Sequence, residues 1–411
     1  MLISFLFTII LIVLLNGTIS SQRKKWVLTA LVFYFVVTMI DFYWLACVLE
    51  RPFHFTDPTD YYTRTLGIPF NGIFKFEENF TNSFYFIVNW SYNHFYDNPY
   101  VISFLIKINN ILVILVSYLF LTKRLPNFSK TDLLLLFNPY LIVTIIRNVR
   151  DPYIILFVAM ILGGLNMLRG VKSNIWLVII GVALLFITRE VLLLAVLLVL
   201  LIRFIKKKKK RAYFIIPIVL VGLWFSKEMI FSRIVMQAVS AMEFVHEDTS
   251  EIAPLLNQQF SLSSLILIVK RFGIGLVALL FTPHPVNYYQ DWMADYGYLG
   301  NCGIYTGFDQ ILICLGAAFC YIFIIPRMFW YIRNCGRINN ELFMFIVFFI
   351  LLYVVAYLGI TDIRNRHFIF FYLLIAIIYK ESELGHRIKL APIDNILSIF
   401  IFTGIFLLST I

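Results

Sequence analysis

Residues 1–48 read MLISFLFTIILIVLLNGTISSQRKKWVLTALVFYFVVTMIDFYWLACV, two apolar runs separated by the basic triplet Arg23-Lys24-Lys25. Each run is close to the length of about 20 apolar residues that crosses a bilayer. Basic residues gather in the cytoplasmic loops of membrane proteins, so the triplet is expected in the cytoplasm. The stretch therefore predicts two membrane helices, near 1–19 and 26–48, and it places residues 50–99 outside.

The composition of the whole chain is that of a protein embedded in a membrane. Of its 411 residues, 61% are hydrophobic and 14% are charged, whereas a soluble domain is about half apolar and a quarter charged. The formal net charge of +11 lies in short basic clusters between apolar runs. Such clusters are typical of cytoplasmic loops, so nucleic acid is not an expected partner. Five cysteines without a metal-ligand spacing predict neither a disulfide framework nor a zinc site.

A span length of about 20 residues, laid along the chain, predicts an all-α polytopic transmembrane helix bundle of about 11–12 spans. These spans would form one integral membrane domain over residues 1–411. Residues 50–99 form the first large outer loop, and residues 226–308 form the second large outer region. Within the second region, the apolar segment 261–281 contains two basic residues. If it crossed, the basic residues that follow would lie outside, so a re-entrant or interfacial helix is expected.

Three apolar stretches are expected to form short segments. Spans at about 132–146 and 153–168 would bracket an outer turn at residues 147–151. The apolar run 175–205 would be about 46 Å long as one helix, and it has basic residues at both ends. Two short segments that meet at Thr188-Arg189-Glu190 fit this pattern better, and they place Arg189 and Glu190 at the outer surface.

Charged residues retained at span ends are candidates for function, because a charge at membrane depth costs free energy. Arg147, Arg150 and Asp151 stand at i, i+3 and i+4, which would place them on one face of a helical turn. Two guanidinium groups there would bind a phosphate while the carboxylate orients one of them. The alternative is a lipid-headgroup anchor. Lys107, about 10 Å into the third span, is expected to pair with an acidic neighbour or a lipid phosphate.

Two further clusters carry the same kind of chemistry. Arg189 and Glu190 would stand between two short apolar segments. The stretch Asp362-Ile-Arg364-Asn-Arg366-His367 offers an acid, two cations and a proton carrier just before the penultimate span. For both clusters, an anchoring role at a helix entrance is the alternative.

Transfer of a sugar needs a group that accepts the proton of the attacking hydroxyl, and a carboxylate or an imidazole can do this. Asp57 and Asp60 in the first outer loop are the best-placed pair by sequence, with Glu190, His284 and His367 as rivals. A solvated loop charge is the alternative for each acid. Aromatic residues of the same loop would stack on sugar faces, or would lie in an interfacial belt without a ligand. They include Tyr61, Tyr62, Trp90 and Tyr92.

The order of these motifs resembles that of a known family of bacterial membrane enzymes. The acidic outer loop is followed by Tyr100-Val-Ile-Ser-Phe-Leu-Ile-Lys-Ile-Asn-Asn110, Phe137-Asn-Pro-Tyr140, Arg150-Asp151, Thr188-Arg189-Glu190 and Arg364-Asn-Arg366-His367. This order is similar to that of the Wzy-type polymerases of O-antigen or capsular polysaccharide, and of the related-looking GT-C glycosyltransferases. The similarity covers most of the chain and rests on loose motifs. The acidic loop follows the second span here, whereas it follows the first in GT-C enzymes.

The resemblance implies a multi-pass glycosyltransferase of the bacterial inner membrane that acts at the outer face. The growing glycan would leave undecaprenyl diphosphate and pass to a hydroxyl of the next lipid-linked repeat unit. Arginines would stabilise the departing diphosphate, namely Arg147, Arg150, Arg189, Arg364 and Arg366. The expected partners are the undecaprenyl-diphosphate-linked oligosaccharide, the lipid bilayer and a chain-length regulator protein. No cofactor is expected.

Two alternatives remain open at this point. A GT-C enzyme would move one sugar from a polyprenyl-phosphate donor, with a divalent metal held by Asp57 and Asp60. A flippase or transporter of lipid-linked oligosaccharides would show inverted repeats, with charges near the midplane of broken helices. The chain has no glycine-rich phosphate-binding loop, so an ATP-driven pump is not expected.

Overall fold

The structure is a computed structural model that describes residues 2–17, 19–54, 57–69, 83–123, 125, 127–164, 174–188, 196–197, 308–334, 346–347, 366–384 and 388–410. The chain divides into two compact units. The first comprises Met1–Glu190, His284–Ile338 and Phe370–Ile411, and the second comprises Val191–Pro283 and Asn339–Ile369. Nearly all described residues belong to the first unit, and the packing reported below lies within it.

The described residues form helices and contain no strand, which confirms the all-α class. The elements are α1 (Leu2–Asn16), α2 (Ser21–Tyr43), η1 (Trp44–Val48), α3 (Asp57–Thr65), α4 (Ser83–Asn93), α5 (Pro99–Thr122), α6 (Lys130–Leu136), α7 (Pro139–Ile146), α8 (Asp151–Gly164), α9 (Ile175–Phe186), α15 (Phe308–Phe319), η6 (Cys320–Ile324), α16 (Ile325–Arg333), α18 (Arg366–Leu384) and α19 (Pro392–Thr410). Both η elements are π-helical turns that continue the helix before them.

In the part of the chain that the structure describes, three helices are long and apolar enough to cross a membrane. They are Ser21–Val48, Pro99–Thr122 and Ile311–Arg333, with 28, 24 and 23 residues. At 1.5 Å per residue these helices are about 34–42 Å long, which exceeds the hydrocarbon core of about 30 Å. The predicted spans near 26–48 and from Tyr100 therefore correspond to helices of sufficient length.

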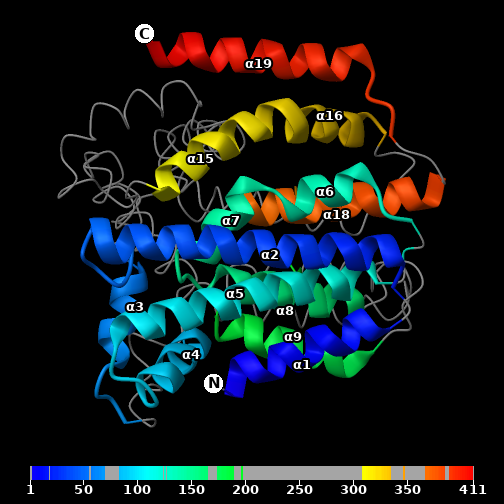
Figure 1. Cartoon of the computed structure of the whole chain (residues 1–411). Helices are drawn as coiled ribbons and strands as arrows, with labels where there is room; N and C mark the ends of the chain where they lie inside the picture. Colours follow the sequence, from blue (N-terminus) through cyan, green and yellow to red (C-terminus); the bar gives the residue numbers. More distant parts are fainter. Residues whose placement is uncertain are drawn as a thin grey trace, which may run out of the picture. The chain divides into compact units, whose positions relative to one another are not determined.

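Helix α5 is the centre of the first unit. It packs against α1, α2 and α8 (Figure 1), and most of its side chains are buried. Its buried polar side chains bond to neighbouring helices: Asn110 Nδ2 donates to Ile145 O at 3.1 Å, and Asn109 donates to the Tyr153 hydroxyl. Because the side-chain amide nitrogens are paired in this way, a helix that carries them can lie in an apolar surrounding.

Helix α2 has the opposite character, because one side of it is exposed and apolar. Val32, Val36 and Ile40 follow one another at i, i+4 and i+8, and each is about half exposed or more. The buried side carries Tyr34 and Val37 and faces α5. An exposed stripe of this size is a liability in water and is normal against lipid. It supports the placement of α2 at the lipid-facing edge of the bundle.

The predicted short span at 132–146 is wrong in detail, because it is broken into two helices. Helix α6 ends at Leu136, and α7 begins at Pro139. Proline has no N–H to continue the hydrogen bonding of a helix, and it fits the first turn of a new one. The Asn138 side chain caps α7 by accepting the N–H of Tyr140 at 3.0 Å. Each helix has only seven or eight residues, which is too short to span a bilayer.

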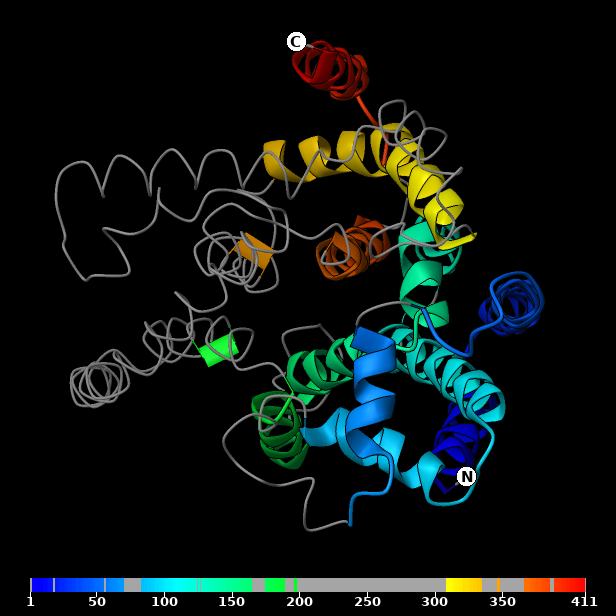
Figure 2. The ribbon, with the colours of Figure 1, turned by 90° about the vertical axis from the view of Figure 1, so that its left-hand side faces the viewer.

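Helices α8 and α9 pack closely, as Figure 2 shows for the two green helices. Glycines make the close approach possible. A Cβ added at Gly164 would lie 2.8 Å from Asn174 O, and one added at Gly181 would lie 3.0 Å from Phe157 O. Small residues at helix contacts are a general means of close packing in membrane proteins. Helix α9 ends at Phe186, two residues before Thr188, which agrees with the predicted end of the first short segment there.

Residues 50–99, predicted as the first outer loop, contain the helices α3 and α4. Helix α4 packs against α5, and its Tyr92 hydroxyl bonds to that of Ser4 in α1. The predicted segment 261–281 lies outside the described residues, as does the predicted second outer region 226–308 except for Phe308.

Candidate functional site

Two helices each bring one charged residue into the interior of the bundle. Asp41 of α2 and Lys107 of α5 are both fully buried, and the Lys107 ammonium donates to Asp41 Oδ2. Asp41 lies seven residues before the end of η1 at Val48, and Lys107 lies eight residues after the start of α5 at Pro99. The two residues therefore lie at similar depth in helices that run in opposite directions. A buried charge is tolerated when it is paired in this way.

His54 extends the pair. Its Nε2 lies 3.0 Å from Asp41 Oδ1, and its Nδ1 lies 3.4 Å from Asp309 Oδ2 in α15. The imidazole is only 1% exposed. The chain reaches this position through Glu50, which has a φ of 52° and turns the backbone after η1. A positive φ is uncommon for a residue other than glycine, and such strain is often found near functional groups.

Arg147 completes the arrangement, because its Nε lies 3.6 Å from the same Asp309 Oδ2. Five side chains thus form a continuous row in which basic side chains alternate with carboxylates, and each of the five is at most 1% exposed. We call them the ionic cluster, which consists of Lys107, Asp41, His54, Asp309 and Arg147. Burial of ionisable groups costs free energy, so a buried cluster of five is a candidate functional site.

The turn between α7 and α8 presents Arg147 to the cluster. Asn148 has a φ of 54°, a conformation that asparagine adopts more readily than most residues. Its Nδ2 donates to Ser103 Oγ at 2.9 Å, and its carbonyl accepts the Tyr85 hydroxyl at 2.5 Å. Burial raises the pKa of Tyr85 well above its usual value, so this phenol remains a donor. The turn is therefore fixed to α5 and α4 at two points.

The expected single helical face of Arg147, Arg150 and Asp151 is not formed, because α7 ends before these residues. Arg147 is the C-cap of α7, Arg150 is half-buried in the turn, and Asp151 begins α8. The Arg150 carbonyl accepts the N–H groups of Tyr153 and Ile154 at 3.1 and 3.3 Å. The positive φ of Asn148 is the physical reason for the break. The two arginines nevertheless lie in one short turn beside the ionic cluster.

The other predicted residues fall into two groups. Asp60 is about half exposed and accepts a hydrogen bond from Arg64 Nε at 2.7 Å along α3, so its carboxylate has a neighbouring cation. Asp57 starts α3, and Arg366 and His367 start α18, but their side chains are not among those described. Arg189, Glu190, His284 and Arg364 lie outside the described residues.

The predicted sugar-stacking aromatics are only partly available. Tyr61 and Tyr92 are buried, and Tyr61 packs edge-on against Tyr85 with ring centroids 4.8 Å apart. Trp90 is half-buried and donates its indole N–H to Ile68 O at 2.9 Å. Tyr61 and Tyr92 thus belong to the core around α4 and do not line a surface for sugars.

A second buried ionic group lies at the other end of α2 and is structural. Arg23 is fully buried and donates to Leu125 O at 2.5 Å and Asn127 O at 2.6 Å. It also lies 3.7 Å from Asp132, which accepts the Tyr118 hydroxyl at 2.6 Å. With its donors directed at two carbonyls, the Asp132 carboxylate and the Tyr118 hydroxyl, Arg23 fixes the segment after α5 to the start of α2.

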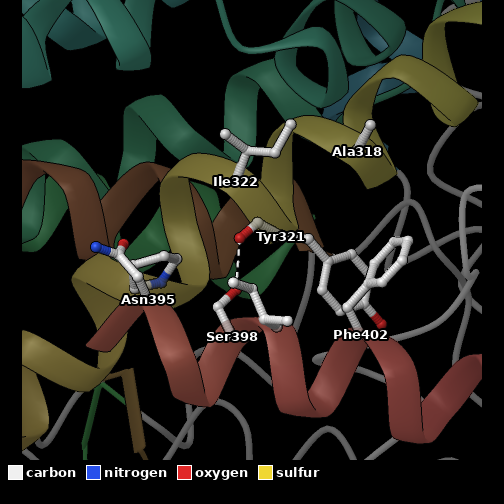
Figure 3. A pocket seen from close by; sticks show the side chains of 8 residues that line it. Ala318, Tyr321, Ile322, Asn395, Ser398 and Phe402 are labelled. Atoms are coloured by element: carbon white, nitrogen blue, oxygen red, sulfur yellow. Dashed lines mark hydrogen bonds between the residues drawn. The ribbon is translucent and has the colours of Figure 1, made fainter. Parts of the chain in front are cut away.

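An apolar cavity of about 480 Å³ lies between η6–α16 and α19 (Figure 3). Two of the residues that line the cavity are joined by a hydrogen bond, which the Ser398 hydroxyl donates to Tyr321 O at 2.5 Å. The residues that line the cavity are Ala318, Tyr321, Ile322, Pro326, Asn395, Ser398, Ile399 and Phe402. None of these carries a charge, so this cavity is not suited to a diphosphate.

Metal binding has no support in the described part of the chain, where no three His, Cys, Asp or Glu side chains converge as ligands. Each nitrogen of His54 faces a different carboxylate, so the imidazole separates Asp41 from Asp309.

Three members of the ionic cluster were not predicted as site residues from the sequence, namely Asp41, His54 and Asp309. One signal was available: Asp41 is the only charged residue between Trp26 and Leu49. A lone acid inside an apolar span predicts a buried partner, and Lys107 is its counterpart in the third span. His54 and Asp309 gave no such signal, because both stand in polar stretches where a solvated charge is normal.

No protein-family model, curated protein or solved structure matches this chain. The chemistry of the ionic cluster therefore has to be judged from its own side chains.

Proposed function

We propose that this protein is a polysaccharide polymerase of the bacterial inner membrane. It would transfer a growing glycan from undecaprenyl diphosphate to a sugar hydroxyl of the next lipid-linked repeat unit, at the outer face of the membrane. The product would be O-antigen or capsular polysaccharide. The energy of the reaction would come from the anomeric bond to the diphosphate of the substrate.

The observation that carries the proposal is the position of Arg147. This predicted diphosphate ligand lies in a cluster of cations and carboxylates, next to the half-buried Arg150. The cluster is near the helix ends that lead into and out of residues 50–99. Fixed cations in a water-poor site stabilise negative charge that develops on a leaving group, because they need no reorganisation during the reaction.

The remaining roles in this proposal are those expected from the sequence. Arg189, Arg364 and Arg366 would add further cations to the diphosphate, and the acceptor hydroxyl would lose its proton to one of four candidates. These candidates are Asp57, Asp60, Glu190 and His367. The topology proposed with this function has about 11–12 spans, and the helix near 261–281 lies re-entrant or at the interface on the outer side.

One observation favours a transporter as the second candidate. The buried pair of Asp41 and Lys107 lies about 10–12 Å inside its two helices, and buried acid–base chains are typical of proton-coupled carriers. A flippase of lipid-linked oligosaccharides would use such a chain to couple the movement of its substrate to protons.

The test is a gel of surface glycan from a strain without the gene, complemented with the wild type or with arginine variants. Arg147→Ala and Arg150→Ala are expected to reduce polymerised product by about 10²-fold or more, because each removes a cation from the leaving group. Arg64→Ala is the matched control: its exposed side chain pairs with Asp60, and the ladder should persist.

The pattern on the gel separates the candidates. A ladder that collapses to a core with one repeat unit supports a polymerase. Loss of all repeat units supports a flippase, and a shift by one sugar supports a GT-C enzyme. Full ladders from both arginine variants, at normal protein level, would rule out the arginine site.

A further inference from the structure

The helix that starts at Phe308 changes its geometry just before Pro326. Proline has no N–H, so the Ile322 carbonyl, four residues earlier, cannot accept the usual helical hydrogen bond from it. The turn Cys320–Ile324 is the π-helical turn η6, and Pro326 stands in the first turn of α16. The ribbon bends where α15 passes through η6 into α16, as Figures 1 and 2 show. A proline and a π-helical turn are both known causes of such a bend.

The bend lies beside the apolar cavity and beside two contacts that hold α19. Tyr321 O, in the π-helical turn, accepts the Ser398 hydroxyl at 2.5 Å. The Tyr321 ring packs edge-on against Phe402, with ring centroids 5.2 Å apart. Ile322 and Pro326 belong to the wall of the cavity (Figure 3). A π-helical turn is often found at a functional site, which makes this cavity a candidate for a ligand.

The size and the lining of the cavity suit a hydrocarbon chain. Its volume of about 480 Å³ falls within the range of about 300–1,000 Å³ that is common for ligand pockets. Its walls run from Ala318 to Pro326 on one side and from Asn395 to Phe402 on the other, which is about 10–12 Å along each helix. The Ser398 hydroxyl is already bonded to a carbonyl, and a water molecule needs several polar partners to stay in a cavity.

The surface around the cavity is apolar as well. Ile322 and Ile399 line the cavity and are 61% and 65% exposed, so the cavity is open to the surroundings where they stand. Leu315 and Phe400, on the same two helices, are also exposed. The helix Ile311–Arg333 is long and apolar enough to cross a membrane. Exposed apolar surface of this kind is normal against lipid, so the cavity is expected to open into the hydrocarbon of the bilayer.

One end of the cavity is polar and basic. Figure 3 shows Asn395 and Phe402 at opposite ends, and Asn395 follows Asp394, which accepts Arg333 Nη2 at 3.0 Å. The Asp394 side chain is buried, whereas that of Arg333 is 43% exposed and Lys389 is exposed. Cations near a membrane surface attract anionic headgroups, and basic residues gather on the cytoplasmic side. This end of the cavity is therefore suited to an anionic headgroup in the cytoplasmic leaflet.

We propose that the cavity between η6–α16 and α19 binds the acyl chain of an anionic phospholipid of the cytoplasmic leaflet. The headgroup lies at the end of Arg333, and the chain is directed towards Phe402. The walls of an empty cavity lack contact partners, and the bound chain supplies these dispersion contacts. The lipid thereby joins α19 to α16. This inference concerns a different part of the molecule from the ionic cluster and does not rest on the proposed function.

Photolabelling of the purified full-length protein in phosphatidylcholine nanodiscs tests the proposal. Three probes carry a diazirine in the hydrocarbon chain, namely a phosphatidylglycerol, a phosphatidylcholine and a polyprenyl phosphate. Ultraviolet light attaches each probe to the protein, and mass spectrometry of the peptides locates it. The phosphatidylglycerol probe should label residues 318–326 and 395–402 about fivefold more than the phosphatidylcholine probe does, because its headgroup is anionic.

Ala318→Phe fills the cavity from its wall. The added ring takes the space of the chain, so labelling by the phosphatidylglycerol probe should fall by about fivefold or more. Leu315→Phe is the matched control, because Leu315 is exposed on the same helix and is not part of the cavity wall. This variant should keep the labelling of the wild type.

A competition with the wild type alone gives a second measurement, which decides the matter should Ala318→Phe not purify as a folded protein. The exposed stripe of Val32, Val36 and Ile40 on α2 serves as the reference for a surface without a cavity. Unlabelled phosphatidylglycerol, still dilute in phosphatidylcholine, should reduce the labelling of the cavity and leave that of the stripe unchanged.

The other outcomes contradict the proposal. Labelling of the cavity that unlabelled phosphatidylglycerol does not displace, or that Ala318→Phe leaves unchanged, would show only the ordinary contact of lipid with an exposed helix. Equal labelling by the phosphatidylglycerol and phosphatidylcholine probes would remove the anionic headgroup from the proposal and with it the stated occupant. Labelling by the polyprenyl probe alone would assign the cavity to a carrier lipid instead. None of these results bears on the proposed polymerase, which the surface-glycan gel tests separately.

Discussion

Asp41 and Lys107 form a pair in which each side chain depends on the other for its place in the interior. Removal of one partner of a buried ion pair leaves a charge without compensation, and the typical cost is about 3–5 kcal/mol. Lys107→Met should therefore lower the free energy of unfolding by roughly this amount. The double variant Asp41→Asn with Lys107→Met should lose less than the sum of the two single changes. Unfolding of the purified protein in detergent gives these three values.

The control for this comparison of single and double variants is Asp60→Asn, which breaks the exposed pair with Arg64 in α3. Such a surface pair contributes about 0.5 kcal/mol or less. Strict additivity of the Asp41 and Lys107 changes would show that the two side chains do not interact, and it would remove the basis for the ionic cluster.

At the scale of residues, the sequence indicated single candidate residues but did not indicate which side chains would contact them in the fold. Lys107 was expected to pair with an acidic neighbour or a lipid phosphate, and in the structure it pairs with the acid Asp41. Arg147 was a candidate ligand, and it lies in the cluster. His54 could not be found, because its role depends on Asp309, which is distant in the sequence and meets it only after folding.

The packing of α8 against α9 belongs to the scale of helices. A methyl group at Gly164 would come within 2.8 Å of the Asn174 carbonyl, which is closer than real Cβ contacts allow. Because a backbone atom is the obstacle, the two helices would have to move apart. Gly164→Ala should destabilise the protein by about 1–3 kcal/mol, which thermal unfolding in detergent would detect.

Gly404 in α19 is the matched position, because a Cβ there meets nothing within 4 Å. Gly404→Ala should leave stability unchanged or raise it by up to about 1 kcal/mol, since alanine favours a helix more than glycine does. Equal effects of the two substitutions would show that the contact between α8 and α9 is not limiting.

Helix boundaries were predictable where the sequence contained a local signal. Asn138-Pro139 is such a signal, because asparagine caps a helix and proline begins one, but the apolar run around it was interpreted as a single span. The break at Asn148 had a weaker signal. It depends on bonds from Asn148 to Ser103 and from Tyr85 to Asn148, which join segments far apart in the chain.

The orientation of α2 is a property of the whole molecule, and two exposed residues at opposite ends of the helix can test it. Lys25 and Glu50 are both exposed and lie at either end of the 28-residue helix Ser21–Val48. In a variant without the five native cysteines, Glu50→Cys should react with a membrane-impermeant maleimide on intact spheroplasts. Lys25→Cys should react only after lysis, because basic residues stay in the cytoplasm.

The opposite labelling pattern would invert the topology and put the ionic cluster at the cytoplasmic end. A polymerase that acts on the outer face would then be excluded, whereas the buried ion pairs would be unaffected.

For the whole molecule, composition and hydrophobic length were enough to predict an all-helical membrane protein. They could not predict that α4, within an apparent loop, packs against α5 and bonds to α1. Its sequence, SFYFIVNWSYN, is apolar but too short to be recognised as a span, so only tertiary contacts define its place.

The residues of the ionic cluster are also synthesised at different times, and their order affects how the nascent chain can fold. A ribosome adds about 5–20 residues per second, so Asp309 follows Lys107 by roughly 10–40 s. Asp41 and Lys107 can leave the translocon together as a neutral pair, because both are made early. His54 and Arg147 are also made early, but the carboxylate that they share arrives only with α15. The nascent chain must therefore keep this end of the bundle hydrated until α15 has been translated.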